Sequence, residues 1–178
     1  MPCRKTNRDT RYILNQAVLC VSAQNLIKLL ARLSRNMDTN TTIWDEKFKT
    51  GVEFMDVEHK QLFDLIEDCI QATRSNEAKE RIIGLLNKIA SHLACHFENE
   101  ENAMRSASDH QFDQHRAQHK YILEKVNSRI SHLCNNDTAI TAQDILYVLY
   151  GWYIAHNASE DKKLADFLRD IARTANSP

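Results

Sequence analysis

Apolar residues recur at every third or fourth position over four long stretches of the chain, which is the pattern of amphipathic helices. The stretches run over residues 57–73, 77–105, 110–133 and 141–158, and short polar segments separate them. Because short loops join helices that lie antiparallel to one another, the stretches should pack side by side. The pattern predicts an all-α fold, an antiparallel up-down four-helix bundle.

Two shorter segments flank the predicted bundle. Residues 38–50 mix polar side chains with Ile43, Trp44 and Phe48, which favours an N-terminal arm laid against the bundle, with Trp44 as its packing anchor. Residues 161–172 keep their apolar side chains on one side, which predicts a short C-terminal helix folded back on the bundle. We therefore expect one domain over residues 37–172, followed by a tail of residues 173–178.

Residues 1–36 form a basic N-terminal extension with a helix-compatible apolar run. Three interpretations stay open for this segment: a targeting presequence, a helix that docks on another surface, or sequence upstream of the true start that is not translated. Its composition is compatible with each of the three. We expect the extension to be dispensable for the bundle that follows.

Composition and charge narrow the function classes. Only three Gly and two Pro occur in 178 residues, which agrees with long helices. Residues 1–40 carry seven Lys or Arg and two Asp, whereas the rest carries 16 basic and 22 acidic residues, so the main domain is acidic. An acidic domain lacks the basic surface that binds nucleic acid, so no nucleic-acid partner is expected. No stretch reaches the roughly 18 apolar residues of a membrane span, so no membrane partner is expected.

The five cysteines are odd in number and scattered, without a Cys-x-x-Cys pair: Cys3, Cys20, Cys69, Cys95 and Cys134. This distribution is typical of reduced thiols in an intracellular protein, and we expect a cytoplasmic location. A disulfide framework or a thiolate zinc site is not indicated. A monomer is the favoured oligomeric state.

Polar residues occupy core positions on all four predicted helices. When each apolar stripe is extended by its own period, it meets a histidine or a carboxylate, and the fifth residue after the last histidine is an aspartate near the end of its helix. A local bend there could bring that carboxylate to the same point. The inward set is His59, His96, Glu100, His115, His119, His156 and Asp161.

The convergence of these groups indicates a metal site. One histidine on an apolar stripe is more often a satisfied core residue than a ligand, but seven converging groups reverse that preference. A buried, unpaired carboxylate such as Glu100 costs several kcal/mol or more unless a cation or a proton compensates it. Five imidazoles and two carboxylates exceed one tetrahedral zinc and match two six-coordinate iron ions.

The motifs around these residues resemble the hemerythrin family, in particular its single-domain bacterial members, over about Ile43 to Leu168. The segments that carry the resemblance are Trp44-Asp45, Gly51-Val52, Asp56-Val57-Glu58-His59-Lys60-Gln61-Leu62-Phe63, His96-Phe97-Glu98-Asn99-Glu100-Glu101 with Met104, His115-x-x-x-His119 and His156-x-x-x-x-Asp161. The resemblance implies a non-haem di-iron centre with an oxo or hydroxo bridge.

The resemblance also implies how the ligands divide. One iron would be held by His115, His119 and His156, the other by His59 and His96, and both would share Glu100 and Asp161. The iron with two histidines would keep an open position for dioxygen. The implied function is reversible dioxygen binding for storage, transport or sequestration, without catalysis.

Two other functions stay open. The domain could instead be a regulatory module that senses oxygen, redox state or iron, or a di-iron enzyme that uses peroxide or nitric oxide. Tyr153 stands where the family commonly has an aliphatic residue near the oxygen pocket, and His92 replaces a commoner tyrosine. Each could change the chemistry beside the ligands, although His92 is more simply a packing residue.

Overall fold

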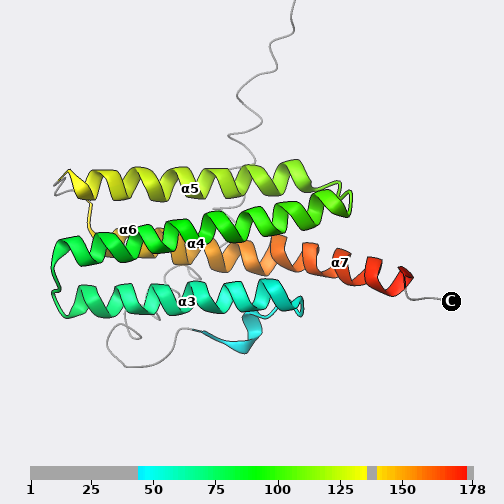
Figure 1. The fold of residues 1–178 in the computed structure, drawn as a ribbon, viewed down its shortest axis with the longest axis horizontal. Coiled ribbons are helices and arrows are strands. Elements are labelled where there is room, and N and C mark those ends of the chain that lie inside the picture. Colours follow the sequence, from blue (N-terminus) through cyan, green and yellow to red (C-terminus); the bar gives the residue numbers. More distant parts are fainter. Residues whose placement is uncertain (1–43, 136–139, 176–178) are drawn as a thin grey trace, which may run out of the picture.

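The computed structural model describes residues 44–135 and 140–175, and these residues form a four-helix bundle (Figure 1). Each helix packs against its neighbours in chain order, and the fourth also packs against the first, so the bundle closes on itself. The predicted up-down architecture is confirmed. Its helices are α3 (Glu53–Arg74), α4 (Lys79–Ser106), α5 (Phe112–Cys134) and α6 (Ala142–His156).

The first helix, α3, begins earlier than the apolar pattern predicts, at Glu53. Asp56 in its first turn accepts hydrogen bonds from the backbone N–H of Thr50 at 2.6 Å, from the Thr50 hydroxyl at 2.8 Å and from the N–H of Gly51 at 3.0 Å. A carboxylate is also favoured at a helix N-terminus by the helix dipole. These polar contacts stabilise an additional first turn of α3. The apolar pattern does not predict them, because it considers only hydrophobic positions.

The N-terminal arm lies against the bundle, as predicted, over the part of it that the structure describes. A single 3-10 turn, η1 (Glu46–Phe48), is capped by Asp45 and buries Phe48. The ring of Phe48 stacks on Phe63 of α3 at 5.2 Å between centroids, and Trp44 meets the same ring edge-on at 5.4 Å. Trp44 is therefore a packing anchor. The expectations for residues 1–36 lie outside the described residues.

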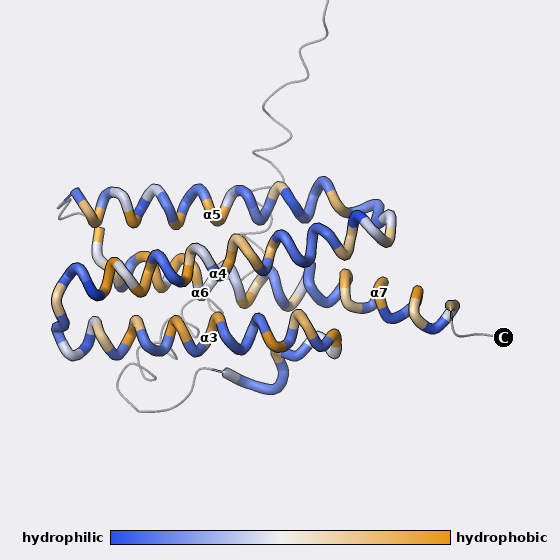
Figure 2. Tube along the Cα trace, viewed as in Figure 1, coloured by the Kyte–Doolittle hydropathy of each residue, from blue (hydrophilic) through white to orange (hydrophobic). Residues whose placement is uncertain are grey.

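The C-terminal segment differs from the prediction of a helix folded back on the bundle. A π-helical turn, η2 (Asn157–Asp161), follows α6 directly and leads into α7 (Lys162–Ala175). These elements form one continuous rod that extends past the end of the bundle (Figure 1). Apolar and polar positions alternate along α7 (Figure 2), and its buried Leu164 and Ala165 pack against Met55 and Met104. The apolar stripe is present as predicted, but it packs on the end of the bundle as a continuation of α6.

The buried apolar residues form two separate clusters along the bundle. The larger one fills the half that contains the α3–α4 and α5–α6 connections and includes Ile66, Leu86, Ile122 and Leu149. The smaller one, with Met55, Met104, Leu164 and Ala165, lies at the opposite end. On α3 the inward His59 falls between Met55 of the smaller cluster and Leu62 of the larger, and on α4 Glu100 falls between Phe97 of the larger and Met104 of the smaller. The core is therefore interrupted by a polar layer.

The described helices include none that is both long enough and apolar enough to cross a membrane. Three cysteines fall within the described residues, and all three are free thiols, with Cys69 buried and Cys95 and Cys134 exposed.

We predict opposite effects for two glycine substitutions. Gly51 has a φ of +82°, and a Cβ there would lie 2.6 Å from Nη1 of Arg169, whose guanidinium donates to the Thr50 carbonyl. Gly51→Ala should lower the free energy of unfolding by about 1–2 kcal/mol, because it forces an L-residue into the left-handed region and displaces Arg169. Gly84→Ala, on the exposed face of α4 with open space at its Cβ, should raise it by about 0.5–1 kcal/mol. Urea unfolding measures both values, and equal effects would contradict the strain at Gly51.

Candidate metal centre

All seven predicted residues come together in the polar layer of the bundle, and each is at most 3% exposed. Every one of the four helices supplies at least one of them. The third helix contributes two imidazoles one turn apart, and the π-turn after α6 contributes the last carboxylate. By element they are His59 on α3, His96 and Glu100 on α4, His115 and His119 on α5, His156 on α6 and Asp161 on η2.

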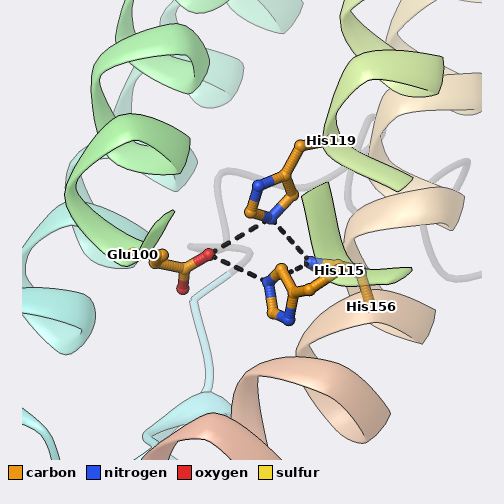
Figure 3. Close-up of side chains that lie close together, drawn as sticks. All are labelled: Glu100, His115, His119 and His156. Atoms are coloured by element: carbon orange, nitrogen blue, oxygen red, sulfur yellow. Dashed lines mark hydrogen bonds and ion pairs between the residues drawn. The ribbon is translucent and has the colours of Figure 1, made fainter. Parts of the chain in front are cut away.

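The imidazoles present their Nε2 atoms to one another. The Nε2 of His156 lies 3.1 Å from that of His119 and 3.2 Å from that of His115 (Figure 3). Across the layer, the Nε2 atoms of His59 and His96 are 3.1 Å apart. Two ligand atoms that are each ~2.1 Å from a metal and at right angles to each other lie ~3.0 Å apart. The observed spacing fits two metal positions.

Two donor groups can be distinguished. One consists of Glu100 with three histidines of α5 and α6, and the other consists of Glu100 and Asp161 with the two histidines of α3 and α4. Glu100 serves both groups, since its Oε2 is 3.2 Å from Nε2 of His119 and its Oε1 is 3.5 Å from Nε2 of His96. Asp161 does the same, with Oδ1 at 3.1 Å from His156 and Oδ2 at 3.4 Å from His59.

The orphaned polar atoms of the described residues gather at this layer. Four buried side-chain oxygens lack a hydrogen-bond partner there: Oε1 of Glu100, both carboxylate oxygens of Asp161, and the Tyr153 hydroxyl. Leaving buried donors or acceptors without partners costs about 1–3 kcal/mol each, and more for charged groups. Three of the four oxygens belong to carboxylates that face two groups of imidazole nitrogens. The donor set therefore fits a pair of metal ions.

The π-helical turn η2 explains how Asp161 joins the layer. In an α-helix, the fifth residue after His156 would lie ~140° around the axis from it. A π-turn is wider and is bonded from residue i to i+5, so it returns Asp161 to the same side as His156. The local bend expected from the sequence is thus a π-turn, an element that is frequent at functional sites.

The outward nitrogens of four imidazoles also have partners, and these partners lie mostly on neighbouring helices. An Nδ1–H that donates outward keeps the Nε2 lone pair directed inward and fixes the plane of the ring. The helical period does not distinguish these residues from other polar positions. Three of the pairs have an oxygen acceptor: His96 with Glu58 at 2.8 Å, His119 with Glu101 at 3.2 Å and His156 with Gln118 at 3.0 Å. The fourth differs, because the Asn157 amide nitrogen lies 3.2 Å from Nδ1 of His59 and can only donate to it.

Glu58 is the most firmly held of these outer partners. Its Oε1 accepts a hydrogen bond from the Asn99 amide at 2.6 Å, while its Oε2 faces Nδ1 of His96. Burial alone would raise the pKa of Glu58, but the hydrogen bonds from His96 and Asn99 outweigh it and lower the pKa. His92 donates from Nε2 to the Glu58 backbone carbonyl at 2.8 Å. His92 therefore ties α4 to α3 beside this carboxylate.

The two buried carboxyl groups of the layer have pKa values that are shifted in opposite directions. Burial and the nearby Asp161 raise the pKa of Glu100 well above its usual value. Burial would also raise the pKa of Asp161, but the nearby imidazoles of His156 and His59 lower it well below its usual value. Burial lowers the pKa of His115 and His119, which keeps these imidazoles neutral. Neutral imidazoles are the form that binds metals.

Different aromatic rings pack against the three-histidine side and the two-histidine side of the layer. On the three-histidine side, Phe97 stacks on His119 at 3.8 Å and Trp152 stacks on His156 at 4.3 Å. On the two-histidine side, Tyr153 meets His59 edge-on at 5.3 Å. Burial, followed by the charges of Asp161 and Glu100, raises the pKa of Tyr153 well above its usual value, so the phenol keeps its proton.

The helical period was sufficient to identify six of the seven inward residues, and Asp161 needed a local bend in addition. The signal for the outer partners was weaker. Glu58 and Glu101 directly adjoin His59 and Glu100 in the sequence, but each pairs with a histidine on another helix. Such a pair forms only because two helices lie close together, and the pattern of a single helix does not show which residues will meet. Cys95 is exposed and apart from the donor groups, as its helical phase indicates. The ligand roles of the seven residues stay predictions.

Comparisons with known proteins agree with this arrangement. Residues 50–168 match the family model described as the hemerythrin HHE cation binding domain. A bacteriohemerythrin of Clostridium acetobutylicum is 20% identical over 127 residues, which cover 70% of this chain and 98% of the relative. A myohemerythrin of Sipunculus nudus is 33% identical over 84 residues, which are 47% of this chain and 64% of that relative, so the match spans slightly less than two thirds of it.

A solved crystal structure of a point mutant shares the fold, with a TM-score of 0.66 at 21% identity, covering 72% of this chain and 98% of the other. A bacteriohemerythrin of Methylococcus capsulatus is 25% identical over 116 residues, which cover 65% of this chain and 87% of that relative. The family match covers more than half of the chain and includes all seven inward residues. The chain belongs to the hemerythrin family.

Proposed function

We propose that this protein binds dioxygen reversibly at a non-haem di-iron centre, for oxygen storage, transport or sequestration. The observation that carries the proposal is the convergence of five imidazole Nε2 atoms and two carboxylates with unpartnered oxygens in one buried layer, divided into two donor groups. A single zinc ion would use four of these seven groups and leave buried donors unpaired. Imidazole and carboxylate together suit iron.

The two proposed iron positions have different numbers of protein donors. His115, His119 and His156 would hold one iron, and His59 and His96 the other, while Glu100 and Asp161 serve both. The first position then has five protein donors and the second has four. The second position would therefore have room for one more ligand than the first. A bound iron pair would supply the two electrons that reversible dioxygen binding needs and recover them on release.

The side chains of the layer would favour reversibility in two ways. Five imidazoles, which are uncharged as metal ligands, and only two carboxylates place less negative charge on the metals than a carboxylate-rich set does, so the ferric state is less stabilised. The donors are at most 3% exposed, and stacked Phe97 and Trp152 cover the three-histidine side, which limits the entry of water. Together these features would slow irreversible oxidation.

We predict that protein purified and loaded under anaerobic conditions contains two iron ions per chain. On exposure to oxygen it should develop visible charge-transfer bands, and these should disappear when oxygen is removed. Metal analysis and visible spectroscopy measure both properties. Fewer than two ions per chain would exclude the di-iron centre. Irreversible conversion to the ferric state with turnover of peroxide would instead favour a di-iron enzyme.

His119→Ala should lower the iron content to about one ion per chain or less, because it removes one of the three imidazoles of its group. His110→Ala is the matched control, since the His110 side chain is 83% exposed and outside both donor groups. Iron content is measured after reconstitution, with circular dichroism to verify that both variants are helical. Equal iron content in the two variants would remove His119 from the proposed ligands.

Glu58→Gln should weaken iron binding by roughly 10- to 100-fold, the usual effect of losing an outer hydrogen-bond partner of a ligand. The substitution replaces a carboxylate that accepts from Nδ1 of His96 with a neutral amide. Glu98→Gln makes the same change of charge on the exposed face of α4 and controls for it. Competition with a chelator measures the affinity, which should fall only in Glu58→Gln.

A further inference from the structure

Tyr153 carries the one orphaned polar atom in the layer that is not a carboxylate oxygen. The residue is 1% exposed, and the Asn157 side chain lies near its hydroxyl oxygen, but no described residue accepts a hydrogen bond from its O–H. The adjoining Asn157 amide nitrogen is directed to the Phe48 carbonyl at 3.1 Å and to Nδ1 of His59 at 3.2 Å. A buried hydroxyl without a partner is rare in folded proteins and calls for an explanation.

The position of Tyr153 points to the side of the centre with fewer donors. Its ring meets the ring of His59 edge-on at 5.3 Å and that of Phe63 edge-on at 5.2 Å. His59 belongs to the donor group with two imidazoles, whereas the stacked rings of Phe97 and Trp152 cover the other group. The unpaired hydroxyl and the free metal site of the proposed function are therefore on the same side.

We propose that the Tyr153 hydroxyl donates a hydrogen bond to a small anionic ligand bound on the His59–His96 side, and so determines which ligands the centre retains. The inference rests on the di-iron centre proposed above. Tyr153 acts there as a neutral O–H donor, so no proton is transferred and no bond other than the hydrogen bond is formed. Phe63 on the other flank of Tyr153 is apolar and cannot compete for the donor.

The proposed hydrogen bond limits the class of ligand that the site would retain. An anion with a terminal nitrogen or oxygen atom can occupy a free metal site and accept the hydrogen bond at once. A ligand without a second acceptor atom, such as a halide ion, gains less from this donor. The ligand must also be small, since Tyr153, His59 and Phe63 are all at most 1% exposed. Azide meets these conditions and serves as the probe.

The test is an azide titration of the iron-loaded ferric protein, followed by visible absorption. Tyr153→Phe should bind azide roughly 10- to 100-fold more weakly than the unmodified protein, the loss expected for a hydrogen bond to a charged group. Its iron content should be unchanged. Tyr150→Phe is the matched control, because Tyr150 is equally buried on α6 but lies ~9 Å before His156 along the helix axis. Its azide affinity should equal that of the unmodified protein.

A second measurement uses the metal-free protein. If the Tyr153 hydroxyl is unpaired, Tyr153→Phe removes a buried orphan and should raise the melting temperature by about 2–4 °C. Tyr150→Phe should give no such increase. This readout does not depend on iron and separates an unpaired hydroxyl from one that has a structural partner.

Three outcomes would overturn the inference. Equal azide affinity in Tyr153→Phe and the unmodified protein would show that the hydroxyl makes no bond to the ligand. A charge-transfer band in the ferric protein without azide, lost in Tyr153→Phe, would show that Tyr153 is itself a metal ligand. An unchanged melting temperature would show that the hydroxyl is already paired. If the unmodified protein bound no iron, the proposed function would fail first, and the metal analysis before titration distinguishes that case.

Discussion

The burial of two carboxylates at the centre of a helical bundle is the constraint on which the rest of this structure depends. Glu100 and Asp161 are both fully buried, and their oxygens face imidazole nitrogens from all four helices. Two such charges in an apolar interior cost several kcal/mol each unless they are compensated. Without metal, the compensation is a raised pKa at Glu100 and the nearby imidazoles of His156 and His59 at Asp161. Two cations would satisfy both carboxylates at once.

How far the sequence could predict this layer depends on the range of the interactions involved. The inward position of His96 and His119 follows from the helical period alone, and the start of α6 follows from the capping box of Thr141 and Asp144. The early start of α3 depends on Asp56 and the Thr50–Gly51 turn. The direction of α7 could not be predicted, because a terminal apolar stripe is compatible with either a return or a continuation.

The π-turn links the site to the end of the bundle. It returns Asp161 to the layer, and it also places Asn157 between the Phe48 carbonyl and His59, so one irregular turn supplies an inner carboxylate and an outer amide. An α-helical continuation would turn Asp161 away from His156. The same turn sets the phase of α7, whose Leu164 then meets Met55 and Met104. The site and the seal of the bundle end therefore share one backbone feature.

The polar layer divides the apolar core into clusters of unequal size, and this division gives the centre a structural role beside its chemical one. The larger cluster is extensive enough to hold four helices together, whereas the smaller has only Met55, Met104, Leu164 and Ala165 fully buried. Contacts across the layer must supply the rest of the cohesion at that end. Hydrogen-bonded pairs such as Glu58 with His96 and Gln118 with His156 cross between helices there. Because these pairs orient the imidazoles as well as join the helices, the geometry of the site and the stability of this end of the bundle are set by the same contacts.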